Sequence, residues 1–117
     1  MTNEPRFAPL ITRLREFGLN YDHIGALVRV DGRQVQRWLI GENEPRLTYR
    51  ENLLALDTIV TLLLDHWTPD EAMIWLLRPH ERLAGEKSPY RMLERERYRA
   101  VLAAARQDVL KVDGISA

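Results

Sequence analysis

The chain has 117 residues, 45% of them hydrophobic, with 17 Lys and Arg against 17 Asp and Glu and no cysteine. This length fits one small domain or one domain with an appended helical unit, and its thin core could be completed by a second subunit. Zero net charge excludes a polybasic nucleic-acid coat, and the lack of cysteine excludes disulfides and thiolate metal sites. No apolar stretch reaches the ~20 residues of a membrane span, and no signal-peptide pattern opens the chain, so we expect a cytoplasmic protein without membrane contact.

Helical patterns follow one another along the chain, with glycine and proline between them. We predict helices that start at or just after Pro9, Asn20, Asp31, Thr48, Thr68 and Ser88, then a last helix over 96–111 and a tail from 112. The T-x-x-E pattern predicts capping boxes at Thr48 and Thr68. No stretch alternates with period two. We therefore predict an all-α fold, with a helix-turn-helix bundle over 1–47, a connecting and dimerisation helix over 48–67, and a C-terminal domain over 68–117.

Residues 21–45 have the spacing of a helix-turn-helix, with two short helices around a tight turn. If Val35, Trp38 and Leu39 pack inward, the polar face of the second helix is left outside. Arginine can fork to guanine and glutamine to adenine, and the start of this helix comes closest to DNA. We therefore predict DNA contacts by Gly32, Arg33, Gln34, Gln36 and Arg37. The alternative is a three-helix core whose polar face is only solvated.

The order of these residues resembles the helix-turn-helix of Xre-type bacterial regulators. Val35, Trp38, Gly41 and Pro45 stand where that pattern expects them. Arg29 stands in the turn where the family usually has glycine, so the turn is either slightly different or mildly strained. Nearby acidic residues weaken the field for phosphate.

Residues 75–94 form the second distinctive stretch. A small apolar core formed by Trp75, Leu76, Leu83, Met92 and Leu93 would account for it physically. The order also resembles the C-terminal domain of Xre/MbcA/ParS-type antitoxins, whose pattern W-x-x-x-P-x-x-x-L-x-G-x-x-P-x-x-x-L matches Trp75, Pro79, Leu83, Gly85, Pro89 and Leu93. Here the spacing from Gly85 to Pro89 is one residue longer, and His80 replaces a common asparagine.

This resemblance implies an antitoxin whose partner is a RES-type toxin that degrades NAD by hydrolysis or phosphorolysis. It implies that the C-terminal domain and tail cover the active-site opening of the toxin, and that the N-terminal domain binds operator DNA and represses the operon. Toxin contacts are then expected at Arg91, Arg95, Arg99, Lys111, Val112, Asp113 and Gly114. The alternatives are a solvated, salt-bridged arginine face and a frayed tail. The alternative functions are a stand-alone Xre-type regulator without a toxin partner and an inhibitor whose DNA face is vestigial.

The predicted connecting helix is apolar on two sides between Leu53 and Trp67. This pattern indicates either packing against another subunit, which would make a homodimer, or burial between the two halves of one chain. The three histidines match no metal spacing, and no glycine-rich phosphate loop follows a strand. We therefore expect no enzymatic activity, no metal and no cofactor.

Overall fold

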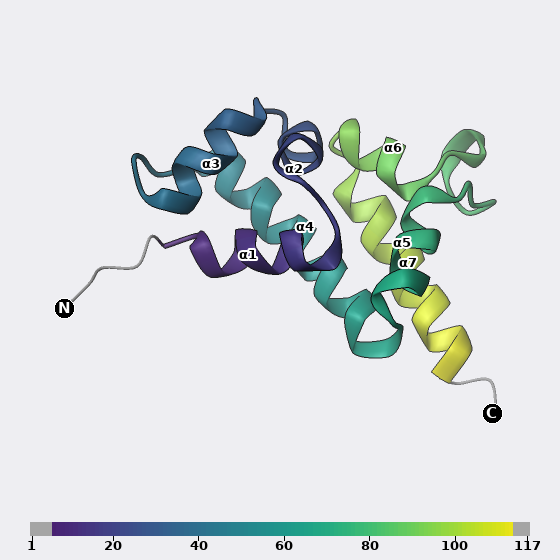
Figure 1. Cartoon of the computed structure of the whole chain (residues 1–117). Helices are drawn as coiled ribbons and strands as arrows, with labels where there is room; N and C mark the ends of the chain where they lie inside the picture. The colour runs from purple at the N-terminus through teal and green to yellow at the C-terminus, as the bar shows by residue number, and fades with distance from the viewer. Residues whose placement is uncertain (1–5, 114–117) are drawn as a thin grey trace.

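The computed structural model describes residues 6–113 of the chain (Figure 1). Within this range the backbone forms helices and no strand, which confirms the predicted all-α class. The helices are α1 (Ala8–Phe17), α2 (Tyr21–Val28), α3 (Gly32–Ile40), α4 (Leu47–His66), α5 (Pro69–Leu77), the 3-10 turn η1 (Ala84–Glu86), α6 (Pro89–Glu94) and α7 (Tyr98–Asp113). None of the helices in residues 6–113 combines the length and the apolar character that crossing a membrane requires.

Side-chain caps begin most of the helices where they were predicted. Asn20 accepts a hydrogen bond from the backbone N–H of His23, and the Nδ1 atom of His23 accepts one from the N–H of Asn20. Asp31 caps α3 with one bond, which its carboxylate accepts from the backbone N–H of Arg33, and the hydroxyl of Ser88 accepts from the N–H of Arg91 at the start of α6. Thr68 and Glu71 form the reciprocal capping box expected at the start of α5. These caps satisfy backbone N–H groups that have no partner within the helix.

Three predicted helix ends are wrong. The helix α4 starts at Leu47, so Thr48 lies inside its first turn and forms no capping box. The last helix starts at Tyr98 and not at residue 96, because Glu96 has the left-handed φ of 61° that reverses the chain after α6. The same helix continues to Asp113, so residues 112 and 113 are helical and not part of a tail.

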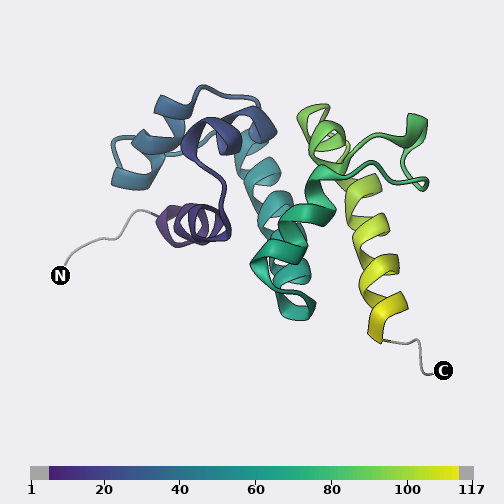
Figure 2. The same cartoon turned by 45° about the vertical axis from the view of Figure 1, so that its right-hand side comes forward.

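The long helix α4 runs through the centre of the molecule and packs against α1, α2, α5 and α7 (Figures 1 and 2). Its buried residues belong to one hydrophobic core with those of both halves of the chain, and they are Leu53, Leu56, Ile59, Val60 and Leu63. Burial between the two halves therefore accounts for its two apolar sides. Leu54 remains 51% exposed on α4.

Hydrogen bonds also join the two halves away from α4. The hydroxyl of Tyr98 at the start of α7 donates to the carbonyl of Leu27 in α2. The guanidinium of Arg29 donates to the carbonyl of Glu94 at the end of α6, at 2.9 Å. Burial raises the pKa of Tyr98 well above its ordinary value, with a smaller contribution from Glu96, so its phenol stays protonated and donates. The α6–α7 corner is thus attached directly to the helix-turn-helix.

Candidate functional site

The turn between α2 and α3 depends on close backbone approach. A Cβ atom on Gly25 would lie 2.5 Å from the carbonyl oxygen of Val30, and one on Gly32 would collide with the carboxylate of Asp22. The two helices can therefore cross tightly near their N-terminal ends. Arg29 ends α2 in the left-handed conformation, with a φ of 76°, so this arginine occupies the position that favours glycine.

The outer face of α3 exposes Arg33, Gln36 and Arg37 to solvent. Gln34 is half-buried, and its amide donates to the side-chain oxygen of Asn43 at 2.8 Å. Gly32, which was expected among the residues nearest to DNA, is buried against the start of α2. Gly32 therefore serves helix packing, and the exposed side chains that follow it form the surface available for base edges.

Two local features limit the positive potential of this face. The Nε atom of Arg37 lies 3.7 Å from a carboxylate oxygen of Glu42, and both side chains are exposed. The carboxylate of Asp31 accepts the backbone N–H of Arg33 at the helix start. Arg33 makes no side-chain hydrogen bond or ion pair with any residue in 6–113, so its guanidinium is available to a partner.

Trp38 anchors α3 to the beginning of α4. Its ring is buried and lies 5.9 Å from the ring of Tyr49, centroid to centroid. As predicted, Val35 is also fully buried, whereas Leu39 is only half-buried. Trp38 and Val35 therefore carry most of the inner face of α3, and Leu39 packs against the edge of the same core.

The residues predicted to contact a toxin fall at two separate places. Arg91, Arg95 and Arg99 are exposed where α6 meets α7, next to α2. The residues 111–113 form the last turn of α7, and their side chains lie outside the described part of the structure, as does the whole of Gly114. Because a helix rises 1.5 Å per residue, residue 99 and residue 113 are about 21 Å apart along α7. The structure therefore does not bring the predicted set together.

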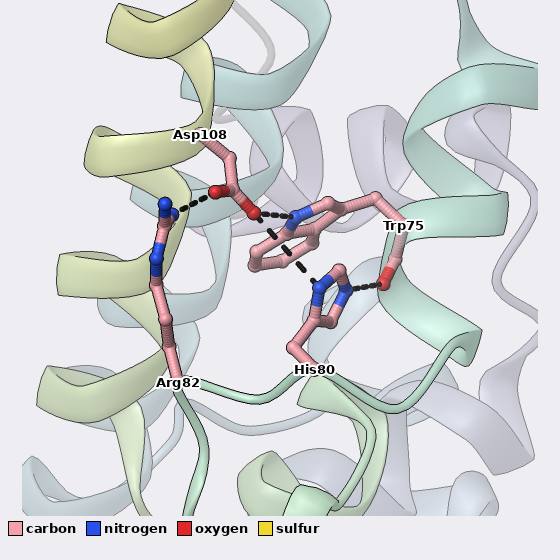
Figure 3. A network of polar contacts seen from close by, with 4 residues as sticks. All are labelled: Trp75, His80, Arg82 and Asp108. Carbon is pink, nitrogen blue, oxygen red and sulfur yellow. Dashed lines mark hydrogen bonds and ion pairs between the residues drawn. The ribbon is translucent and has the colours of Figure 1, made fainter.

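A polar network holds the loop after α5 against α7 (Figure 3). The carboxylate of Asp108 accepts the indole N–H of Trp75 at 2.7 Å and pairs with the guanidinium of Arg82. The Nε2 atom of His80 lies 2.9 Å from the carbonyl oxygen of Trp75 and donates to it, since a carbonyl can only accept. The Nδ1 atom of His80 lies 3.9 Å from Asp108. One carboxylate thus connects Trp75 of α5 with Arg82 of the following loop, and His80 lies beside this pair.

Three aromatic rings beside this network pack against one another in a row, each tilted relative to the next. The centroids of Trp67 and Trp75 are 6.2 Å apart, and those of Trp75 and His80 are 4.9 Å apart. Together with Arg82 and Asp108 they line an open cleft of about 470 Å³. Sequence reasoning missed Asp108, because it lies 33 residues from Trp75 and no local pattern marks it. The described residues contain no group of three or more potential metal ligands.

The comparisons with known proteins agree with the resemblance stated for the sequence. No protein-family model matches the chain. It is 31% identical over 96 residues to the probable mycobacterial cidal antitoxin Rv3188 of Mycobacterium tuberculosis, a match that covers 82% of this chain and 81% of the relative. Its fold is similar to that of a chain in the crystal structure of the M. tuberculosis MbcT-MbcA toxin-antitoxin complex, with a TM-score of 0.74, 24% identity, and coverage of 97% of this chain and 98% of the other. The chain therefore belongs to the mycobacterial cidal antitoxin family.

Proposed function

We propose that this protein neutralises a partner toxin by direct binding and represses its own operon through the helix-turn-helix. The observation that carries the proposal is its membership of an antitoxin family, established over most of the chain. A second support is the separation of α3 from the C-terminal end of α7, since these two segments lie on opposite sides of the molecule (Figures 1 and 2). A protein with two such surfaces can hold DNA and a protein partner at the same time.

The toxin partner is proposed to be a RES-type enzyme that degrades NAD, as the resemblance implies. We assign its contacts to the C-terminal end of α7 and the following residues, where Lys111, Val112, Asp113 and Gly114 were predicted to bind. Leu110 immediately precedes them and is 66% exposed, and α5 exposes Ile74 and Leu77 on one face. Exposed apolar side chains of this kind favour burial against a protein partner. Occupation of the active-site opening would then exclude NAD from the toxin.

Co-expression tests this half of the proposal. The neighbouring reading frame is expressed alone and together with this protein, while cell growth and the cellular NAD content are followed. Growth arrest with NAD loss is expected for the neighbour alone, and recovery of both is expected with this protein present. A neighbouring frame that is harmless alone would instead support a stand-alone Xre-type regulator. Persistent toxicity in the presence of this protein contradicts direct neutralisation.

The DNA half of the proposal assigns base contacts to Arg33, Gln34, Gln36 and Arg37. The test measures fluorescence anisotropy on a labelled duplex from the region directly upstream of the coding sequence, with a scrambled duplex as reference. Replacement of Arg33 and Arg37 by alanine should cost about 1–3 kcal/mol for each base whose hydrogen bonds are removed, and it should reduce the preference for the upstream duplex. No binding by the unaltered protein at low salt would show that the DNA face is vestigial.

We further propose that the protein acts as a homodimer. Leu47 and Leu54 are 66% and 51% exposed, and they lie two helical turns apart on α4. A dimer would place two recognition helices on half-sites about 34 Å apart, so that each needs few base contacts. Sedimentation equilibrium measures the mass of the protein in solution. A monomer at micromolar concentration, with no second copy on the DNA, would contradict this arrangement.

A further inference from the structure

We propose that the arginines where α6 meets α7 extend the DNA-binding surface by contacting the phosphate backbone beside the helix-turn-helix. This arginine corner consists of Arg91, Arg95, Arg97 and Arg99, all of which are exposed. The inference rests on the proposed DNA binding by α3. The toxin contacts expected from the sequence include Arg91, Arg95 and Arg99. This inference assigns these three arginines to a nucleic acid instead.

The position of the corner beside α2 is the first argument. The ring of His23 at the start of α2 meets the ring of Tyr90 in α6 edge-on, with centroids 6.3 Å apart. In a helix-turn-helix, the first helix crosses the DNA backbone while the second lies in the major groove. The helix α6 therefore flanks the helix that would cross the backbone. Figures 1 and 2 both show α3, α2 and α6 following one another along one edge of the molecule.

The attachment of the corner is firm enough to preserve this alignment. Arg29, in the turn of the helix-turn-helix, donates to the carbonyl of Glu94 in α6. Tyr98 donates to the carbonyl of Leu27 at the other side of the corner. The corner and the recognition helix thus form parts of one packed body. Phosphate contacts made by the corner would therefore fix the register of α3 in the groove.

The charges of the corner are the second argument. Within residues 6–113 none of its four guanidinium groups makes a hydrogen bond or an ion pair, whereas Arg13 and Arg82 are paired with carboxylates. Of the two glutamates between the arginines, Glu94 is half-buried and Glu96 accepts from the amide of Asn52 at 3.4 Å. Four exposed guanidinium groups with five donors each are suited to phosphate oxygens.

The helix that follows strengthens the positive potential of the corner. The first turn of α7 contains Arg99 and no acidic residue, although the positive end of a helix dipole normally favours one. The chain as a whole has zero net charge, so general attraction to DNA is weak. The arginine corner is a local cluster of positive charge on the described surface, and it can supply affinity for DNA that does not depend on the base sequence. The C-terminal turn assigned to the toxin lies about 21 Å away along the same helix.

The experiment compares two double variants with the unaltered protein. Arg91→Gln with Arg95→Gln removes two charges from the corner and keeps polar side chains at both positions. Arg78→Gln with Arg106→Gln is the matched control, because both arginines are exposed and unpaired within residues 6–113 and lie outside the corner. Anisotropy is measured on the upstream duplex and on the scrambled duplex at several salt concentrations. Affinity for the purified toxin is measured in parallel.

The corner variant should lose affinity for both duplexes by the same factor. The slope of log K against log salt should fall in magnitude by about 1.8, since each phosphate contact contributes about 0.9. The control should retain the original slope, and toxin affinity should not change in the corner variant. An unchanged slope in the corner variant overturns the inference while DNA binding by α3 stands. If the corner variant binds the toxin more weakly but keeps its affinity for DNA, the inference is overturned in favour of a toxin contact. If the unaltered protein does not bind DNA, both the phosphate contacts of the corner and the proposed DNA binding by α3 are overturned.

Discussion

The indole of Trp75 donates its Nε1 hydrogen to the carboxylate of Asp108 at 2.7 Å, and this bond ties the end of α5 to α7. The same carboxylate pairs with Arg82 in the loop between them. Val101, Ala105 and Val109 pack α7 against α4 in the hydrophobic core, and the polar link attaches α5 and the loop after it to this helix.

Replacement of Asp108 by alanine should therefore destabilise the protein. It leaves the indole N–H and the guanidinium without their acceptor, and we expect a loss of about 1–3 kcal/mol in the free energy of unfolding. The stability of the Asp108→Asn variant should lie between those of the unaltered protein and the Asp108→Ala variant, because its amide oxygen can still accept from Trp75. Urea denaturation measures the loss, and Gln107→Ala, an exposed neighbour on the same helix, is the control. Equal stability of the Asp108→Ala and Gln107→Ala variants would contradict a structural role for the network.

Replacement of Gly32 by alanine should destabilise the helix-turn-helix, although alanine favours a helix. The added methyl would collide with the Asp22 side chain and lie 3.1 Å from the backbone of α2. The exposed carboxylate of Asp22 can move aside, so the cost comes from displacing the backbone atoms of Tyr21 and Asp22, and we expect about 1–3 kcal/mol, more than the gain in helix propensity. Thermal unfolding provides the measurement, with Gln36→Ala on the exposed face as reference. A gain in melting temperature for Gly32→Ala would show that the two helices are not in such close contact.

Tyr98→Phe should weaken the connection between the two halves. The phenol donates to the carbonyl of Leu27, and removal of the hydroxyl should cost about 1 kcal/mol. Tyr90→Phe is a matched control, because that hydroxyl makes no hydrogen bond with a residue in 6–113. Urea denaturation of both variants separates the hydrogen bond from the effect of losing a hydroxyl. Similar losses in the two variants would contradict the assigned bond.

The capping box at the start of α5 should make stability depend on pH. Hydrogen bonds from the backbone and side chain of Thr68 lower the pKa of Glu71 below its ordinary value of 4.5. Because the pKa of Glu71 is lower in the folded protein, its ionised carboxylate stabilises the folded state above about pH 4.5. This stabilisation is lost as the pH falls through the folded-state pKa. Glu71→Gln should therefore lower the melting temperature at pH 7, and the difference from the unaltered protein should shrink as the pH falls below the lowered pKa of Glu71. A constant difference across this range would argue against the box.

Deletion of residues 112–117 should weaken toxin inhibition more than DNA binding. The deletion removes the end of α7, on the side of the molecule away from α3, so the side chains proposed to contact DNA keep their positions. Calorimetry with the purified toxin and anisotropy with the upstream duplex measure the two affinities on the same preparation. Loss of DNA binding with full toxin inhibition would reverse the proposed assignment of the two ends.

Local patterns were sufficient for most of the secondary structure. Asn20, Asp31, Thr68 and Ser88 cap the helices they were predicted to cap, because the hydrogen bonds involved span only two or three residues. The error at Thr48 has a local cause as well. Arg46 is the N-cap residue of α4 and makes no side-chain cap, and the guanidinium of Arg50 donates to the carbonyl of Pro45 at 2.7 Å.

The sequence by itself determined the all-α class, the helix-turn-helix and the family, because each of these is carried by residues close together in the chain. The tertiary structure decided where the surfaces lie. It buried Gly32 against α2, placed the arginine corner beside the helix-turn-helix, and joined Trp75 to Asp108 across 33 residues. Such contacts depend on how α2, α6 and α7 pack around α4, and periodicity cannot reveal them, since it shows which face of a helix is buried but not which helix covers it.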